Sequence, residues 1–250
     1  MKIFRAKNES LVEQNLDCCI IGIPSQILVK PYVDFNKTQH YEYKENHTSA
    51  RLPLLLGCRA KEQGTVADRV KVSVYFESLC SDSMRFFKNQ LYPVWKDLQD
   101  IIDLEFIPFG KARAIPTETG DYEFECQHGP DECFGNRVMS CAQNSLPIGT
   151  QVEFFQCMMT KRYPAFFGKQ CSEKVGIAWT PLQECVESVK SAAMLYQNGV
   201  RTASLKPQVY FIPTITINGR YDSRRLRISL MALRSQICAS YDGPPHQNCL

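Results

Sequence analysis

Residues 71–109 show in turn the patterns typical of a strand, a helix and a second strand, and this order constrains the fold more than any other feature. Residues 71–76 alternate apolar side chains with more polar ones, which is the period of a β-strand. From Asp82 onward, apolar residues recur at spacings of three and four, as in a helix that buries one face, and Pro93 predicts a kink in that helix. Residues 101–109 are rich in β-forming side chains. The chain therefore opens with a βαβ unit.

The stretch 111–206 separates this unit from the rest of the domain and is interpreted as an insertion. It carries six cysteines and, in its later part, two helical segments, and it contains no internal repeat. One of these helices is predicted to begin at Thr180, which is followed by a proline and by Gln183 at the capping-box position. Gly199 suits the position just past the end of that helix.

A ββα ending is predicted after the insertion. Residues 214–217 alternate isoleucine with threonine, and the pair Asn218-Gly219 favours a type I′ hairpin turn. A final amphipathic helix follows. Its apolar side is formed by Leu226, Leu230, Leu233 and Ile237.

Cys80 is the first candidate for chemistry, because it lies where the first predicted strand hands over to a helix. The unpaired N–H groups and the positive dipole end of a helix stabilise a thiolate, which is the nucleophilic form of cysteine. Asp82 opposes this effect slightly. We expect the Cys80 side chain at the surface. The alternatives are a buried inert cysteine or one half of a disulfide.

The residues Ile212, Pro213 and Thr214 precede the predicted hairpin. In an oxidoreductase with the order βαβ…ββα, a cis proline ahead of that strand lies against the helix-start cysteine and presents backbone to an incoming peptide. We therefore predict a substrate-binding role for these three residues. The alternative is a trans proline that opens an edge strand, since X-Pro bonds are only occasionally cis.

The chain has 12 cysteines among 250 residues, which favours an oxidising compartment. Eight cysteines remain when Cys80 and the N-terminal Cys18, Cys19 and Cys58 are set aside. This even number suits four disulfides, and the spacing of the eight cysteines leaves their pairing open. The remaining cysteines are Cys126, Cys133, Cys141, Cys157, Cys171, Cys185, Cys238 and Cys249. Three of them and His128 could ligate zinc, but they lack the paired C-x2-C spacing of common structural sites, so no bound metal or cofactor is predicted.

Residues 1–60 are interpreted as an N-terminal extension that is poorly ordered and contains or ends in a signal segment. The apolar run 52–57 follows Arg51 and suits a signal peptide cleaved near residue 60, which leaves a domain at residues 70–250. A lipoprotein signal ending at Cys58 is the alternative. No apolar stretch approaches the roughly 20 residues of a membrane-spanning helix, so no membrane is expected in the mature form. The net charge of +3, without a basic cluster, excludes nucleic acid as a partner.

The residues from 70 to 250 resemble the gamma-interferon-inducible lysosomal thiol reductase (GILT) family. The family signature C-Q-H-G-x-x-E-C-x-x-N-x-x-x-x-C is met without a spacing error. The matching residues are Cys126, Gln127, His128, Gly129, Glu132, Cys133, Asn136 and Cys141. The resemblance implies a thioredoxin-like α/β fold with a helical, disulfide-bonded insertion, reduction of disulfides in protein substrates, and a lysosomal or secreted location.

One departure from the family pattern concerns the active site. The family has C-x-x-C, whereas this chain has Cys80 followed three residues later by Ser83, so the resolving thiol is absent. We therefore predict that Cys80 forms a mixed disulfide which an external small thiol, cysteine or glutathione, must release. Ser83 either donates a hydrogen bond to the Cys80 thiolate or is an ordinary first-turn residue. The competing function is a module that binds cysteine-containing partners without turnover.

Overall fold

The computed structural model describes residues 67–249, with only the backbone described for residues 223–225. The predicted N-terminal extension, its cleavage site near residue 60, and Cys18, Cys19 and Cys58 all lie outside the described residues. Within the described part, no helix is long and apolar enough to cross a membrane.

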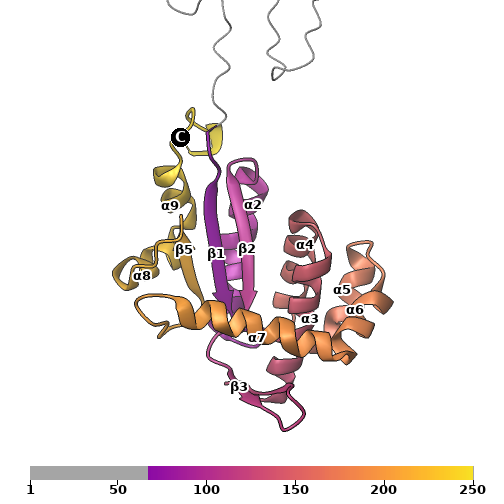
Figure 1. Cartoon of the computed structure of the whole chain (residues 1–250). Coiled ribbons are helices and arrows are strands. Elements are labelled where there is room, and N and C mark those ends of the chain that lie inside the picture. Colours follow the sequence, from indigo (N-terminus) through magenta and orange to yellow (C-terminus); the bar gives the residue numbers. More distant parts are fainter. Residues whose placement is uncertain (1–66, 250) are drawn as a thin grey trace, which may run out of the picture. The chain divides into compact units, whose positions relative to one another are not determined.

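A three-stranded sheet forms the centre of the domain (Figure 1). Its strands are β1 (Val70–Phe76), β2 (Ile102–Pro108) and β5 (Thr214–Ile217), in the order β2-β1-β5. Strand β1 pairs with β2 in parallel and with β5 antiparallel. All three strands lie where the sequence predicts them, and the parallel pair confirms the βαβ opening.

The helix between β1 and β2 runs as three segments of different geometry: α1 (Ser81–Phe86), the π-helical turn η1 (Phe87–Leu91) and α2 (Tyr92–Leu98). Pro93 lies in the first turn of α2. Because proline has no N–H to donate to the preceding turn, the regular hydrogen-bond ladder changes there. The regular α-helical pattern is therefore interrupted next to Pro93, by the π-helical turn η1.

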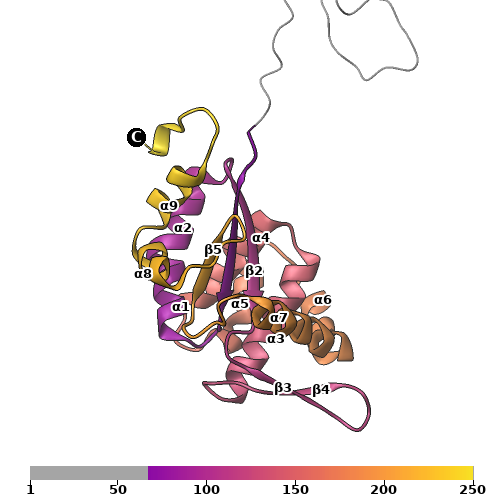
Figure 2. The ribbon, with the colours of Figure 1, turned by 60° about the vertical axis from the view of Figure 1, so that its left-hand side comes forward.

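Helices cover both faces of the sheet (Figure 2). On one face, Trp95 of α2 and Leu233 of α9 (Leu233–Ser240) meet Val72 of β1 around a small internal space. On the other face lies α7 (Val189–Ser204), whose Arg201 side chain approaches Glu105 of β2 to 2.6 Å. The sheet is thus the middle of three layers.

The second helical layer also explains the burial of polar residues on β1 and β2. The Ser73 hydroxyl donates a 2.6 Å hydrogen bond to Glu105 on the α7 side of the sheet, and Ser73 is buried. Period-two alternation placed Ser73 opposite the apolar face correctly, but α7 removes this second face from solvent. A buried hydroxyl is tolerated there because its hydrogen bond is made.

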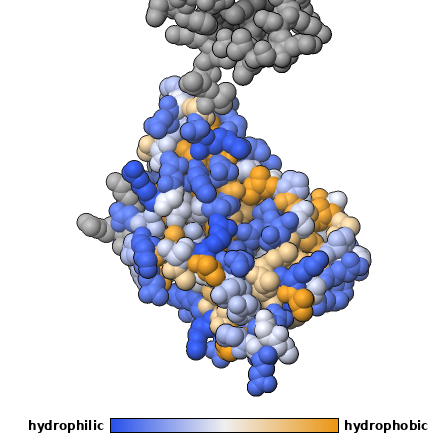
Figure 3. Space-filling model, viewed as in Figure 1, coloured by the Kyte–Doolittle hydropathy of each residue, from blue (hydrophilic) through white to orange (hydrophobic). Residues whose placement is uncertain are grey.

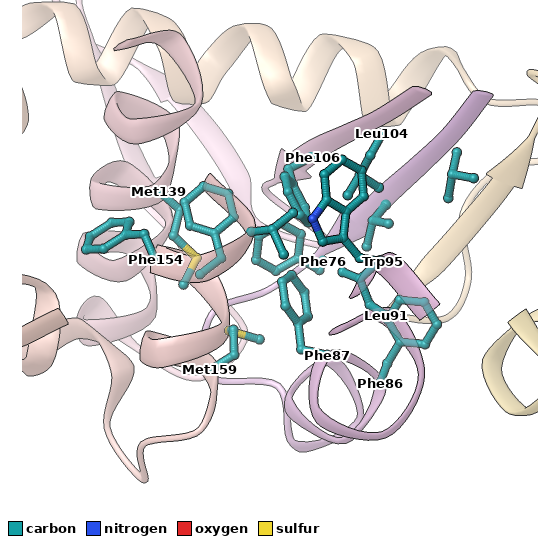
Figure 4. Packing of buried hydrophobic residues seen from close by; sticks show 14 of the residues in the cluster. Phe76, Phe86, Phe87, Leu91, Trp95, Leu104, Phe106, Met139, Phe154 and Met159 are labelled. Atoms are coloured by element: carbon teal, nitrogen blue, oxygen red, sulfur yellow. The ribbon is translucent and has the colours of Figure 1, made fainter. Parts of the chain in front are cut away.

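The centre of the core is a cluster of aromatic rings contributed by the βαβ unit and the insertion (Figure 4). The ring of Phe76 on β1 lies 4.9 Å from that of Phe87 on η1, and the ring of Phe106 on β2 lies 4.9 Å from that of Phe155 on α4 (Ile148–Met159). The centroids of Phe87 and Phe106 are 5.6 Å apart. The insertion therefore shares the core of the sheet instead of forming a separate module.

On the face seen in Figure 3, the surface is mostly hydrophilic, with separate hydrophobic patches.

The insertion is richer in regular structure than the two helical segments that the sequence predicts. It contains a hairpin and five α-helices within the described residues. These elements are β3 (Arg113–Pro116), β4 (Tyr122–Glu125), α3 (Pro130–Ser145), α4 (Ile148–Met159), α5 (Gly168–Lys174), α6 (Trp179–Glu187) and α7, with a 3-10 turn η2 (Pro164–Phe167).

The single helix predicted from Thr180 to Gly199 is wrong. Helix α6 begins at Trp179 and ends at Glu187, and α7 begins at Val189 after the extended residue Ser188. Gly199 lies inside α7, where an added Cβ would come within 2.6 Å of the Phe109 ring. Close packing between helix and ring, not helix termination, accounts for this glycine.

The C-terminal part follows its prediction with two differences. Asn218 and Gly219 both have positive φ, 49° and 70°, as a type I′ turn requires, but the returning strand is only an isolated bridge between Ile217 and Arg220. The single final helix is also wrong: α8 (Ser223–Met231) and α9 are separated by the non-helical residue Ala232. A short 3-10 turn, η3 (Gln247–Cys249), follows α9.

Candidate active site

Cys80 is the N-cap residue of α1, the helix that follows β1. Its backbone is extended, with φ −68° and ψ 119°, and its carbonyl accepts the first helical hydrogen bond, from the Met84 N–H at 3.0 Å. The sulfur is therefore attached where the unpaired N–H groups of α1 begin. The predicted junction of strand, cysteine and helix is present.

The Cys80 side chain is buried, with 8% of its surface exposed, so the prediction that it lies at the surface is wrong. The segment before β5 covers it: the thiol donates to the Ile212 carbonyl oxygen, 3.6 Å from the sulfur. The Ile212–Pro213 peptide bond is cis, the geometry that the sequence pattern led us to expect. The hydroxyl of Thr214 donates to the Phe211 carbonyl at 2.7 Å and is directed to its own loop.

Charged groups near the start of α1 form a pair. Asp82 lies in the first turn, where its charge would oppose a thiolate at Cys80, and Arg85 approaches its carboxylate to 3.0 Å. Both side chains are exposed, so water screens this pair. The guanidinium partly offsets the negative charge that the sequence placed beside Cys80.

Ser83 is fully buried, and its hydroxyl oxygen lies 3.5 Å from the backbone N–H of Glu77, which donates to it. Of the two alternatives raised by the sequence, this contact favours a first-turn residue that fastens the preceding loop. It places the hydroxyl against the end of β1.

Helix α3 holds the residue two positions before Cys80. The Ser78 N–H donates to Oδ1 of Asn136 at 2.9 Å, and the Ser78 hydroxyl donates to the Glu132 carbonyl at 3.0 Å. A Cβ added to Gly135 would lie 2.5 Å from the Ser78 oxygen, so the helix and the loop are in close contact. The segment that carries Cys80 is thus docked on the first turns of α3.

Glu77 also belongs to this site, and the sequence analysis missed it. It is fully buried, and its Oε1 accepts the Lys111 N–H at 2.7 Å. Burial raises the pKa of its carboxyl, and the nearby Glu132 raises it further, while the Lys111 N–H and His128 lower it. Gly110, at φ 62°, brings the backbone so near that an added Cβ would overlap the Glu77 side chain.

His128 and Glu132 complete a cluster with Glu77. The imidazole Nδ1 of His128 lies 2.6 Å from Oε2 of Glu132 and 3.5 Å from Oε2 of Glu77. The backbone N–H of His128 donates to Oε1 of Glu132 at 3.1 Å. Their positions in the signature were visible in the sequence, but their meeting with Glu77 was not. No local pattern connects residues so distant in the chain.

Eight cysteines form four disulfides, as their even number predicts. The pairs are Cys126–Cys133, Cys141–Cys185, Cys157–Cys171 and Cys238–Cys249. Because three of these sulfurs were those considered for zinc, the thiolate zinc site is excluded in this state. Among the described residues, Cys80 is the free cysteine.

Comparisons with known proteins agree with this architecture. Residues 71–175 match the family model "Gamma interferon inducible lysosomal thiol reductase (GILT)". The oxidised BdbD of Bacillus subtilis superposes with a TM-score of 0.53 at 13% identity, over 72% of this chain and 91% of that chain. This similarity shows the fold, which is thioredoxin-like, with the disulfide-bonded insertion between the two halves as predicted.

Relatives from several animals match most of the chain. GILT-like protein 1 of Drosophila melanogaster is 32% identical over 82% of this chain and 87% of its own length. The gamma-interferon-inducible lysosomal thiol reductase of Carassius auratus is 32% identical over 73% of each chain. GILT-like protein C02D5.2 of Caenorhabditis elegans is 35% identical over 72% of this chain and 55% of its own length. With this coverage and the cysteine framework, the chain belongs to the gamma-interferon-inducible lysosomal thiol reductase family.

Proposed function

We propose that this protein reduces disulfide bonds in protein substrates and that Cys80 is its nucleophile. One observation carries the proposal: the free cysteine of the described residues lies at a helix start and faces the carbonyl of the cis-proline segment. The sulfur and the backbone that would receive a substrate peptide therefore lie together. The family supplies the class of reaction, and its chemistry needs cysteine side chains but no bound cofactor.

The first step is thiol-disulfide exchange. The Cys80 thiolate attacks one sulfur of the substrate disulfide, a mixed disulfide forms at Cys80, and the other substrate sulfur leaves as a thiolate. The Ile212 carbonyl holds the unreacted thiol at 3.6 Å, so ionisation of Cys80 gives up this weak hydrogen bond. The N–H groups at the start of α1 stabilise the resulting thiolate.

Release needs a second thiol, because Ser83 has no sulfur. An external thiol such as cysteine or glutathione attacks Sγ of Cys80, and the second substrate sulfur leaves as a thiol. A second molecule of external thiol then regenerates Cys80 and carries away the small-molecule disulfide. Overall, one protein disulfide is reduced and two small thiols are oxidised.

The surroundings of Cys80 suit a polypeptide substrate. Tyr210 and Phe134 are exposed, and each belongs to a segment that contacts the active-site loop. Tyr210 lies two residues before Ile212, and Phe134 is adjacent to Gly135, which contacts the active-site loop at Ser78. Exposed aromatic side chains on the two segments next to the active-site loop favour substrates with accessible apolar segments, as in partly unfolded proteins.

Trapping of the mixed disulfide tests the proposal. The wild type, incubated with a disulfide-containing peptide and no small thiol, is expected to gain the mass of one peptide half at Cys80 in non-reducing mass spectrometry. Added glutathione should release the peptide and restore turnover. Cys80→Ser should show neither adduct nor turnover.

The matched control removes two other cysteines while leaving Cys80 in place. The Cys238–Cys249 disulfide lies near the C-terminus, so the double serine variant should still form the adduct. Turnover by Cys80→Ser would move the chemistry to another cysteine. An adduct that glutathione never releases would instead favour the competing function, a module that binds cysteine-containing partners without turnover.

We also propose that the protein works in a lysosomal or secreted compartment. Four disulfides in the described residues are stable in such oxidising surroundings and rare in a reducing cytosol. The relatives from Carassius auratus and Mus musculus are named as lysosomal enzymes. Fluorescence microscopy of the tagged full chain with an organelle marker tests the location.

A further inference from the structure

The Glu77, His128 and Glu132 side chains converge beside the active-site loop from three separate places in the chain. Glu77 follows β1, His128 precedes α3, and Glu132 lies in the first turn of α3. One ligand-type atom from each lies within 4.8 Å of the other two. Two carboxylates and one imidazole at these distances are donors that a transition-metal ion can share.

We propose that Glu77, His128 and Glu132 form a binding site for a divalent transition-metal ion of the Zn²⁺ type. The ion would join the end of β1 to the start of α3. It takes no part in the thiol exchange, for which the family needs no metal. Its role is to hold together the two elements that position the loop with Cys80.

An unpartnered buried oxygen supports this site independently of the clustering. Oε2 of Glu77 has no hydrogen-bond partner, and the Glu77 side chain is only 1% exposed. This oxygen lies 3.5 Å from Nδ1 of His128, so it is directed into the cluster. A buried oxygen without a donor is costly, and a bound cation would satisfy it.

The charges in the cluster also favour a cation. Glu77 and Glu132 are both fully buried, and His128 is the one basic side chain within contact distance of the two carboxylates in the described residues. The two carboxylates thus share one basic group in contact, and the Lys111 charge acts on Glu77 only from a longer range. The dipole of α3 partly opposes a cation, but it amounts to only about half a charge.

The distances fit a small ion with modest movement. Zinc binds imidazole nitrogen and carboxylate oxygen at about 2.0–2.2 Å, which separates two tetrahedral ligand atoms by about 3.3 Å. The separation of His128 Nδ1 from Glu77 Oε2 is 3.5 Å, and that from Glu132 Oε2 is 2.6 Å. The His128 and Glu132 ligand atoms would therefore need to move apart by less than 1 Å. His128 is 39% exposed, so water can reach the ion as a fourth ligand.

The hydrogen bond that Glu77 accepts resembles those that hold the ligands of a metal site in position. The Lys111 N–H already fixes Oε1 at 2.7 Å, which leaves Oε2 pointing at His128. Gly110 allows this approach because any side chain there would overlap Glu77. Such fixed carboxylates are typical of metal ligands.

Metal titration of the chelator-treated protein tests the proposal. All proteins carry Cys80→Ser, so that no free thiol among the described residues competes for the metal. At pH 7.5, calorimetry with Zn²⁺ should show one equivalent bound, and Co²⁺ should give visible absorption without a thiolate charge-transfer band. Glu77→Gln and His128→Gln should each weaken Zn²⁺ binding by about 100-fold or more. Zn²⁺ should also raise the melting temperature only where it binds.

A matched control uses another histidine that faces a carboxylate. Nε2 of His246 lies 3.1 Å from Asp100 on the surface, so His246→Gln should bind Zn²⁺ like the parent. His128 is partly exposed, and its variant is expected to fold, which far-UV circular dichroism checks. Absence of one-equivalent binding, or binding that survives both Glu77→Gln and His128→Gln, would overturn the proposal.

Discussion

Replacing Gly110 by alanine should disturb the active-site loop through a single buried contact. The glycine has φ 62°, in the left-handed region, and an added Cβ would come within 2.6 Å of Cδ of Glu77 and closer still to two other atoms of that side chain. Glu77 cannot move away freely, because it is buried and its Oε1 holds the Lys111 N–H. The substitution therefore combines backbone strain with a collision.

The size of the effect can be worked from these contacts. A non-glycine residue in the left-handed region costs about 1–2 kcal/mol, and overpacking typically costs about 1–3 kcal/mol. Loss of the hydrogen bond to Lys111 adds about 1 kcal/mol. Gly110→Ala should thus lower the free energy of unfolding by about 3–6 kcal/mol.

Gly120 provides a matched control, since it has φ 82° and nothing within 4 Å of an added Cβ. Gly120→Ala should cost only the strain, about 1–2 kcal/mol, and the unfolded-state effect of adding a methyl group is common to both variants. The assay is urea unfolding with disulfides intact, followed by circular dichroism. Gly110→Ala should also slow formation of the Cys80 adduct, because Glu77 lies three residues before Cys80.

A double-mutant cycle isolates the collision. Glu77→Ala removes the atoms that the new Cβ would meet, so in that background Gly110→Ala should cost no more than Gly120→Ala. Equal costs for the two glycine substitutions in the wild-type background would refute the reasoning. So would an excess cost that persists without the Glu77 side chain.

Three further outcomes are expected. Ser83→Cys should restore intramolecular release, so it should accumulate less peptide adduct than the wild type when glutathione is scarce; equal trapping in mass spectrometry would count against Ser83 as the obstacle. The folded-state pKa of Glu77 is raised above its ordinary 4.5, so its contribution to stability is fully present below that value and is lost as the pH rises through the raised pKa. Glu77→Gln should remove this loss, so chelator-treated wild type and variant should diverge in unfolding free energy as the pH rises above 4.5, and parallel curves would contradict the assignment. Phe106→Ala, at a fully buried ring, should cost about 3–5 kcal/mol in urea unfolding, and a loss below about 1 kcal/mol would mean that the core closes over the gap.

Local chemistry in the sequence determined the elements that carry the proposed reaction. Alternation of side chains predicted β1, and the change to helical spacing placed Cys80 at a helix start. Asn218-Gly219 predicted its turn because both residues tolerate positive φ. These features depend on residues within a few positions of one another, so a linear pattern records them.

Helix boundaries in the insertion depended on packing and not on local signals. Thr180 and Gly199 have the residue types of a helix start and end, yet the chain breaks at Ser188 and continues through Gly199. The ring of Phe109, far away in the sequence, occupies the space beside that glycine. Capping preferences of about 1 kcal/mol are outweighed by tertiary contacts of this kind.

The surroundings of Cys80 were decided by tertiary structure alone. Its sequence context determined a helix-start thiol, but the Ile212 carbonyl, 132 positions away, buries it. Likewise, Glu77 meets His128 and Glu132 only because α3 docks on the end of β1 through Ser78 and Asn136. The sequence by itself therefore placed the proposed nucleophile, Cys80, at the start of its helix. The burial of Cys80, the disulfide pairs and the carboxylate cluster depend on long-range packing, which leaves no periodic pattern in the local sequence.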